Sequence, residues 1–366
     1  MMSEWRTIRA ADFIDFNPRL NLKKGAITTK VAMDKLKPFT KKIPETEKAE
    51  FNGGAKFCNG DTVMARITPC LENGKTAYVD MLDDGEIGFG STEFIVMRAK
   101  AGISDPQFVY YTAINPTFRN VAIKSMVGSS GRQRVQQSVL EELELSVPGL
   151  DEQRRIGAFL AELDEKIALN NKINDNLEQQ MHLIFEDMMA KATNNKIKGE
   201  FIVAKSLTQV ITGKEDANFS VSNGKYKFFT CSNTPLHCDE YAFNSSSVLI
   251  AGNGDFNVKH YSGKFNAYQR TYVLSPQKEY YAILYLAALY RINSFKTGSS
   301  GSIVKFITKS DVENIPVFMP HDSKYLDELN KLVIMQEQNM LENELLVQLR
   351  DWLLPMLMNG QATISD

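Results

Sequence analysis

An internal repeat is the feature that most constrains the fold of this 366-residue chain. The four residues Gly128–Gly131 read GSSG, and the same four letters return at Gly298–Gly301, 170 residues later. A short strand-like stretch that ends in proline follows each copy, at Leu143–Pro148 and at Ile315–Pro320. A long helical segment comes next both times. Two copies of one order of elements predict a duplicated unit of roughly half the chain.

Two long helices are predicted, from about Asp151 to Ala192 and from about Ser323 to Leu354, where Pro355 ends the second. Apolar residues step by three and four positions in the first helix, at Ile156, Leu160, Leu163, Ile167, Leu177, Met181, Ile184 and Met188. The second helix carries Leu326, Leu329, Val333, Leu341, Leu345, Leu349 and Trp352. Because neither helix can bury its stripe alone, we expect them to pack antiparallel, with Asn170 and Asn174 as polar residues of the seam.

Short strands and a short helix follow the same order in the two remaining parts of the chain. Strands are predicted at Thr62–Ile67, Glu93–Met97, Ser247–Ala251 and Arg270–Leu274, with helices at Phe108–Ala113 and Tyr280–Tyr290. The fold class is therefore α+β, with two pseudo-repeated domains separated by two long helices that form an antiparallel coiled coil. We expect domains at 1–148 and 194–320, and helices at 149–193 and 321–366.

Charge is divided unevenly along the chain, although the formal net charge is only −2. Residues 1–150 hold 20 basic and 18 acidic side chains, and residues 194–320 hold 14 and 9. The helical segments are acidic, with 5 basic against 9 acidic residues in 151–193 and 3 against 8 in 321–366. This division allows the globular parts to offer basic surface to phosphate while the helices face solvent or protein.

The sequence favours a cytoplasmic protein without a membrane span. The first twenty residues mix charged and apolar side chains, unlike a signal peptide, and no run reaches the roughly 18 apolar residues that span a bilayer. The four cysteines form no C-x-x-C pair, and His237 beside Cys238 is a weak zinc signal, so free thiols are expected and no metal site.

Catalytic motifs are missing from the sequence. Asn115–Phe118 reads Asn-Pro-Thr-Phe, which lacks the second proline of an adenine methyltransferase motif and is interpreted as a helix-ending turn. No phosphate-binding loop of the form G-x-x-x-x-G-K-[ST] occurs, and Gly252-Asn253-Gly254 lacks the third glycine of a dinucleotide fingerprint. Asp83, Asp84 and Glu86 are interpreted as solvated turn residues. We expect no cofactor and no catalytic residue in this chain.

Several stretches resemble the specificity subunit of type I restriction–modification systems. Asp61–Lys75 is similar to a signature of that family, and Gly90–Met97 fits the same target recognition domain. In the second half, Ala251–Gly254 and Gly263–Thr271 look like a variant of that domain. Asp151–Ile156 resembles the start of the first spacer helix, whereas the second helix begins without the Glu-Gln-Arg sequence.

The resemblance implies a subunit without catalytic activity that reads a split, asymmetric sequence in double-stranded DNA, one half per domain. It also implies docking to two modification (methyltransferase) subunits and, in the full complex, to restriction subunits. Methyl donor, magnesium and ATP would belong to those partners. Two rivals are a coiled-coil adaptor that binds only protein and a stand-alone methyltransferase or nuclease. Salt-sensitive binding of duplex DNA distinguishes the first rival from a DNA reader.

Candidate DNA-binding residues carry hydrogen-bond donors or positive charge, because reading DNA requires contacts to base edges and phosphates. In the first domain they are Arg66, Thr68, Asn73, Lys75, Ser129, Ser130, Arg132 and Gln133. In the second domain they are Asn253, Asn257, Lys259, Gln269, Arg270, Ser299, Ser300 and Lys305. The alternative is a purely structural role, in which Arg66 only ends a strand and both GSSG loops are tight turns. Phe159 and Phe185 lie off the apolar stripe of the first helix and are predicted to dock the modification subunits.

Overall fold

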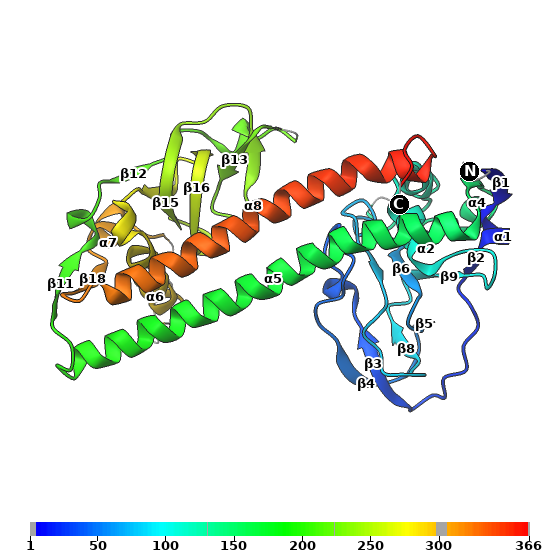
Figure 1. Ribbon diagram of the computed structural model, residues 1–366, viewed down its shortest axis with the longest axis horizontal. Coiled ribbons are helices and arrows are strands. Elements are labelled where there is room, and N and C mark those ends of the chain that lie inside the picture. Colours follow the sequence, from blue (N-terminus) through cyan, green and yellow to red (C-terminus); the bar gives the residue numbers. More distant parts are fainter. Residues whose placement is uncertain (1–4, 130, 223, 298–305, 365–366) are drawn as a thin grey trace. The chain divides into compact units, whose positions relative to one another are not determined.

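The structure, a computed structural model, describes residues 5–129, 131–222, 224–297 and 306–364, without the side chains of 295–297 (Figure 1). The chain divides into two compact units. Unit 1 combines Met1–Leu169 with Asn343–Asp366, and unit 2 is Asn170–Glu342. Each unit thus contains one predicted domain and a part of both long helices. No helix in the described ranges has the length and apolar character needed to cross a membrane.

Unit 1 contains two four-stranded sheets. The first has the order β2-β9-β6-β7, with strands Ile14–Phe16, Phe94–Ala99, Thr62–Ala65 and Thr76–Tyr78, all antiparallel to their neighbours. The second has the order β4-β3-β8-β5, with strands Glu47–Glu50, Ile27–Val31, Gly88–Gly90 and Ala55–Phe57. The two strands expected from the sequence are β6 and β9, which lie side by side in the centre of the first sheet.

The short helices of unit 1 are α1 (Ala10–Phe13), η1 (Met33–Lys35), α2 (Pro106–Ile114), α3 (Pro116–Lys124) and α4 (Gln137–Glu141). Of these, α2 packs against β6, β7 and β9 of the first sheet. Phe108, Tyr110 and Tyr111 of α2 are buried in the core of unit 1. Asn115 ends α2 and caps α3, since its side-chain oxygen accepts the Thr117 N–H at 3.0 Å. The expected helix-ending turn is therefore present, and a second helix starts directly from it.

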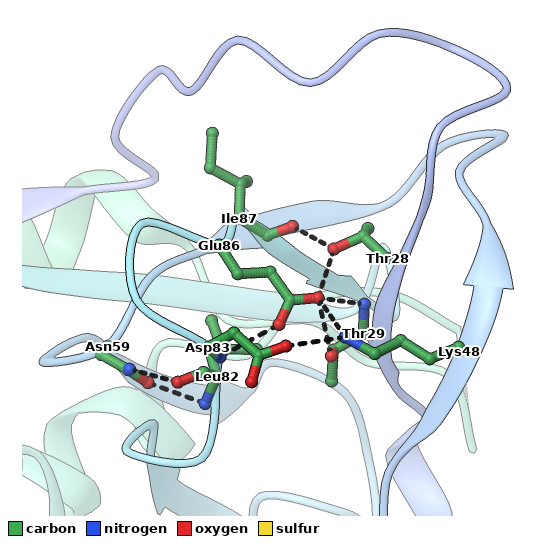
Figure 2. Close-up of polar contacts among 8 residues, drawn as sticks. All are labelled: Thr28, Thr29, Lys48, Asn59, Leu82, Asp83, Glu86 and Ile87. Carbon is green, nitrogen blue, oxygen red and sulfur yellow. Dashed lines mark hydrogen bonds and ion pairs between the residues drawn. The ribbon is translucent and has the colours of Figure 1, made fainter.

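Glu86 is half-buried in a hydrogen-bond network beside β3, not solvated as the sequence suggested (Figure 2). Its carboxylate accepts from the Thr28 and Thr29 hydroxyls at 2.7 and 2.8 Å, from the Thr29 N–H at 2.8 Å and from Lys48 Nζ at 2.7 Å. It also accepts the Asp83 N–H at 3.1 Å. Burial alone would raise the pKa of Glu86, but the hydrogen bonds outweigh burial and hold the pKa well below its usual range.

Glu86→Gln is expected to destabilise the chain by roughly 1–3 kcal/mol at neutral pH, because the half-buried carboxylate that accepts several hydrogen bonds loses its charge. A depressed folded-state pKa stabilises the protein above the ordinary carboxyl pKa, and this contribution disappears as pH falls below it. The difference between wild type and variant should therefore shrink on acidification from about pH 5. Urea titrations at several pH values measure it, with Asp84→Asn, an exposed acid of the same turn, as the control. A pH-independent difference would contradict the assignment.

Unit 2 is built on one six-stranded sheet with the order β12-β17-β15-β16-β13-β14. Its strands are Val210–Thr212, Thr271–Leu274, Phe243–Ala251, Val258–Ala267, Tyr226–Phe229 and Leu236–Cys238. Its helices are η2 (Ala204–Ser206), η3 (Ala217–Phe219), η4 (Lys278–Tyr280), α6 (Tyr281–Thr297) and α7 (Lys309–Glu313). The predicted strands β15 and β17 are again neighbours, and α6 packs against β15 and β16.

The repeat appears in the structure as one antiparallel strand pair in each unit, whose second strand leads into a long helix. In unit 1, β1 (Arg6–Arg9) pairs antiparallel with β10 (Glu144–Val147), which leads into α5. In unit 2, β11 (Gly199–Val203) pairs antiparallel with β18 (Pro316–Pro320), which leads into α8. A five-residue helix, α4 or α7, precedes the second strand of each pair. The duplication inferred from GSSG and proline is thus confirmed at the level of strand pairing.

The two long helices, α5 (Leu150–Thr193) and α8 (Lys324–Met358), pair antiparallel in both units, as predicted (Figure 1). In unit 1, Arg350 of α8 bonds to Asp164 of α5 at 2.6 Å. In unit 2, Asn170 Nδ2 donates to Glu342 at 2.7 Å, and Asn174 Oδ1 accepts from Asn339 at 2.9 Å. Asn170 and Asn174 are both buried, which confirms them as polar residues of the seam.

The sequence predicts that the apolar stripe of α8 lies in the seam, but the structure places it elsewhere. Its first part, Leu326, Leu329 and Val333, is buried in the core of unit 2 together with Met181 and Met188 of α5. The second part is exposed, at Leu341, Leu345, Leu349 and Trp352. The sequence-based expectation was wrong here because the helices bury much of their apolar surface against the globular domains, while polar pairs such as Asn174 with Asn339 lie between the helices.

Pro355 also departs from expectation, since α8 continues through it to Met358. Proline removes the backbone hydrogen bond of its own nitrogen, and its ring crowds the carbonyl four residues earlier, at a cost of about 3 kcal/mol inside a helix. Leu354, Leu357 and Met358 are buried in the core of unit 1. Their burial offsets the missing bond and carries the helix one turn further.

A carboxylate on each long helix, buried in unit 1 and half-buried in unit 2, accepts a hydrogen bond from a tyrosine of the domain that precedes the helix. In unit 1, the Tyr111 hydroxyl donates to Asp164 of α5 at 2.6 Å, and Arg350 binds the other carboxylate oxygen. In unit 2, the Tyr281 hydroxyl donates to Glu337 of α8 at 2.6 Å. A buried charge must be paired to be tolerated, so these contacts restrict how each domain sits on its helix.

Candidate nucleic-acid interface

The ends of the two central strands of unit 1 meet the segment that follows the first GSSG loop. The Arg66 N–H donates to the Glu93 carbonyl at 2.9 Å, and the Arg66 carbonyl accepts the Val135 N–H at 2.8 Å. Ile67 forms a β-bridge with Arg134. We call this arrangement the strand-end junction of unit 1. It joins two stretches that the sequence singled out separately, residues 66–75 and 128–133.

Unit 2 contains the same junction, bond for bond. The Gly252 N–H donates to the Arg270 carbonyl at 2.9 Å, and the Gly252 carbonyl accepts the Ile307 N–H at 2.8 Å. Asn253 forms a β-bridge with Phe306. Gly252 therefore corresponds to Arg66, and Arg270 corresponds to Glu93. The backbone of the site is duplicated, while its charged side chains differ.

The first GSSG loop lies next to the strand-end junction of unit 1. The Thr68 N–H donates to the Gln133 carbonyl at 3.0 Å, which places these two candidates side by side. Ser129 and Arg132 are exposed. Gly128 and Gly131 have φ of +140° and +80°, the positive values that the tight-turn alternative predicts. Ser130 lies outside the described residues.

Two other candidates of unit 1 differ in their exposure and in the contacts that they make within the fold. Asn73 is exposed in the turn after Pro69. Lys75 is half-buried, and its Nζ donates to the Met33 carbonyl at 2.9 Å, so one donor of this ammonium group already serves the fold. Arg134 was missed by sequence reasoning, although it follows Arg132 by two positions. Arg134 binds the Glu93 carboxylate at 2.6 Å, and this hydrogen bond lowers the pKa of Glu93.

The candidates of unit 2 divide between inner and outer positions. Asn257 Nδ2 donates to the Cys231 carbonyl at 2.8 Å, and Lys259 Nζ donates to the Thr230 carbonyl at 3.3 Å and also binds Asn257. Burial lowers the pKa of Lys259 to about 8. Gln269 and Arg270 are exposed, and both line a groove of about 320 Å³. Ser299, Ser300 and Lys305, with the second GSSG loop, lie outside the described residues.

The two predicted docking residues are not equivalent. Phe159 is half-buried against the core of unit 1. Phe185 is only 4% exposed and packs in the core of unit 2, with its ring centroid 6.2 Å from that of Tyr290. The expectation that Phe185 offers a free surface is therefore wrong, because α6 covers it. Among the described residues, no group of three or more His, Cys, Asp or Glu side chains is placed to hold a metal ion.

Comparison with known proteins identifies the family. The family model for the type I restriction modification DNA specificity domain matches residues 2–179 and 197–345, which together make up most of the chain. This chain belongs to that family. The two matched segments contain the strand-end junctions of both units, and each continues into one of the long helices.

Individual relatives match a smaller part of the chain. The EcoDI type I specificity subunit of Escherichia coli is 37% identical over 164 residues, which is 43% of this chain and 37% of that protein. The EcoAI specificity subunit of the same species is 35% identical over 128 residues, 35% of this chain and 20% of that protein. The matched region is thus well under half the length of these curated relatives.

A solved structure shares the fold over nearly the whole length. The type I restriction-modification S subunit from M. genitalium aligns over 97% of this chain and 96% of its own, with a TM-score of 0.57 and 18% sequence identity. This likeness confirms the fold class predicted from the repeat.

Proposed function

We propose that this chain is the DNA-reading specificity subunit of a cytoplasmic type I restriction–modification complex. Each unit reads one half of a bipartite, asymmetric target in double-stranded DNA. The observation that carries the proposal is the duplicated strand-end junction, with one backbone and two different sets of charged and amide side chains. A reader of two unlike half-sites needs this combination, because phosphate contacts fix the register while base-edge contacts distinguish sequences.

The proposal assigns no chemistry to the chain itself. Adenine methylation and ATP-dependent cleavage belong to modification and restriction subunits, in agreement with the missing motifs of the sequence. The purified chain is expected to transfer no methyl group, cut no DNA and hydrolyse no ATP. Assays with labelled methyl donor, plasmid DNA and ATP test this expectation. Methyl transfer by a preparation free of modification subunits would contradict it.

The long helices provide the docking surface for two modification subunits in this proposal. An exposed apolar stripe on α8, consisting of Leu341, Leu345, Leu349 and Trp352, replaces Phe185 as the best candidate. Leu183 of α5 is also exposed. Steps of four, four and three residues place the four α8 side chains on one face of the helix. Large apolar groups in solvent are characteristic of protein interfaces.

Two measurements test the proposed function as a whole. Binding of the purified chain to duplex DNA should weaken steeply with salt, whereas a coiled-coil adaptor should show no such binding. Co-expression with a modification subunit that binds this chain should then methylate one split sequence throughout a genome. Exchange of residues 1–148 for the domain of a relative should change only one half of that sequence. A change in both halves, or in neither, would contradict one half-site per unit.

A further inference from the structure

A basic groove opens beside the strand-end junction of unit 1. It has a volume of about 580 Å³, and its charged lining side chains are Arg19, Lys56 and Arg66, with no carboxylate in the lining. The three cations come from separate parts of the chain: the loop after β2, strand β5 and the end of β6. Glu93, the neighbour of Arg66 across the junction, is paired with Arg134.

Contacts with the fold hold two of these cations in place. Lys56 Nζ donates to the Leu20 carbonyl at 2.8 Å and lies 5.3 Å from the centroid of the Phe51 ring. Arg66 is bonded through its backbone on both sides, and its Nε is enclosed without a hydrogen-bond partner. The Arg66 side chain makes one long contact, from Nη2 to the Val135 carbonyl at 3.5 Å. Both side chains retain donors that the protein does not use, and Arg19 is exposed.

From this arrangement we infer that the groove binds the phosphate backbone of duplex DNA. Three cations that share an open groove without a carboxylate repel one another, and an anion that enters relieves this repulsion. A phosphodiester accepts hydrogen bonds from several directions, whereas a base edge requires one forked donor in a fixed register. The groove would therefore position unit 1 on any duplex, and the exposed loop residues beside it would remain for sequence reading. This inference rests on the proposed function.

The test measures the salt dependence of binding to a labelled duplex of mixed sequence, because a phosphate contact requires no target site. The full-length variants Arg19→Gln, Lys56→Gln and Arg66→Gln each remove one cation. Each is expected to reduce the slope of log K against log salt by about one unit and to weaken binding to all duplexes alike. Lys124→Gln, an exposed lysine at the end of α3 outside the groove, is the matched control. Thermal melting verifies folding. If a variant at half-buried Lys56 or Arg66 is unstable, Arg19→Gln, at an exposed site, still tests the groove.

The outcomes separate this inference from the function on which it rests. A wild-type chain that fails to bind duplex DNA contradicts the proposed function itself. Binding with an unchanged slope in all three folded variants contradicts only the groove. Loss of preference for one base by Arg66→Gln, without a change of slope, would make Arg66 a base reader and overturn the phosphate assignment. Competition by inorganic phosphate at constant ionic strength, abolished in the variants while the duplex slope is retained, would assign the groove to free phosphate instead.

Discussion

Replacement of both Leu345 and Trp352 by glutamate is expected to abolish co-purification of this chain with its modification subunits. These two side chains of α8 are 58% and 64% exposed, and they pack on no described part of the core. If Leu345 and Trp352 form the centre of the interface, each glutamate that replaces them must bury a charge when the complex forms. Loss of one such anchor costs about 2–4 kcal/mol. Two such losses weaken the complex by roughly 1,000-fold or more. Affinity capture of the tagged chain with co-expressed methyltransferase measures the effect.

Two controls make this result interpretable. Ile27→Glu introduces the same chemistry at a side chain of β3 that is 77% exposed, and it should leave the complex intact. Phe185→Glu places a charge in the core of unit 2, so it should lower the melting temperature before it affects any interface. Intact complexes with the Leu345 and Trp352 double variant would show that the modification subunits dock elsewhere, on the recognition domains.

Sequence periodicity predicted the two long helices correctly but not what their faces contact. A helical repeat determines which residues share a face, and for Leu341, Leu345 and Leu349 this prediction was right. The partner of a face depends on the other apolar surfaces nearby. The recognition domains provide large ones, so Phe185 and Val333 became core residues while Trp352 remained in solvent. A local sequence pattern does not show which of several apolar surfaces a helix face will pack against.

From the sequence, the region of the candidate site could be predicted, but not which of its side chains are free to bind. The repeat located both strand-end junctions, because GSSG and the preceding strand occur in both halves. Residue type alone did not tell whether a donor was free, and Lys75 and Lys259 each donate to a backbone carbonyl. Arg19 and Lys56 were missed because they join Arg66 only through the fold. A groove assembled from three distant segments leaves no motif in the sequence.

Helix length is expected to set the number of unspecified base pairs between the two half-sites. Antiparallel pairing means that α5 and α8 must be lengthened together, since Asn174 bonds to Asn339 and Asp164 to Arg350. Seven residues inserted after Leu169 and seven before Asn343 keep the helical phase and add roughly 10 Å. At about 3.4 Å per base pair, the spacer should grow by up to about three base pairs.

The bases read in each half-site should stay the same, because both recognition domains are untouched. Insertion of four residues at the same two places should be tolerated less well, since it breaks the seven-residue phase and rotates one part of the helix pair against the other. Genome-wide mapping of methylated sites, with each variant and its modification partner, measures spacer and half-sites together. If the active seven-residue variant still methylates the original spacing, the modification subunits must place the two domains, and the helices then act only as their docking surface.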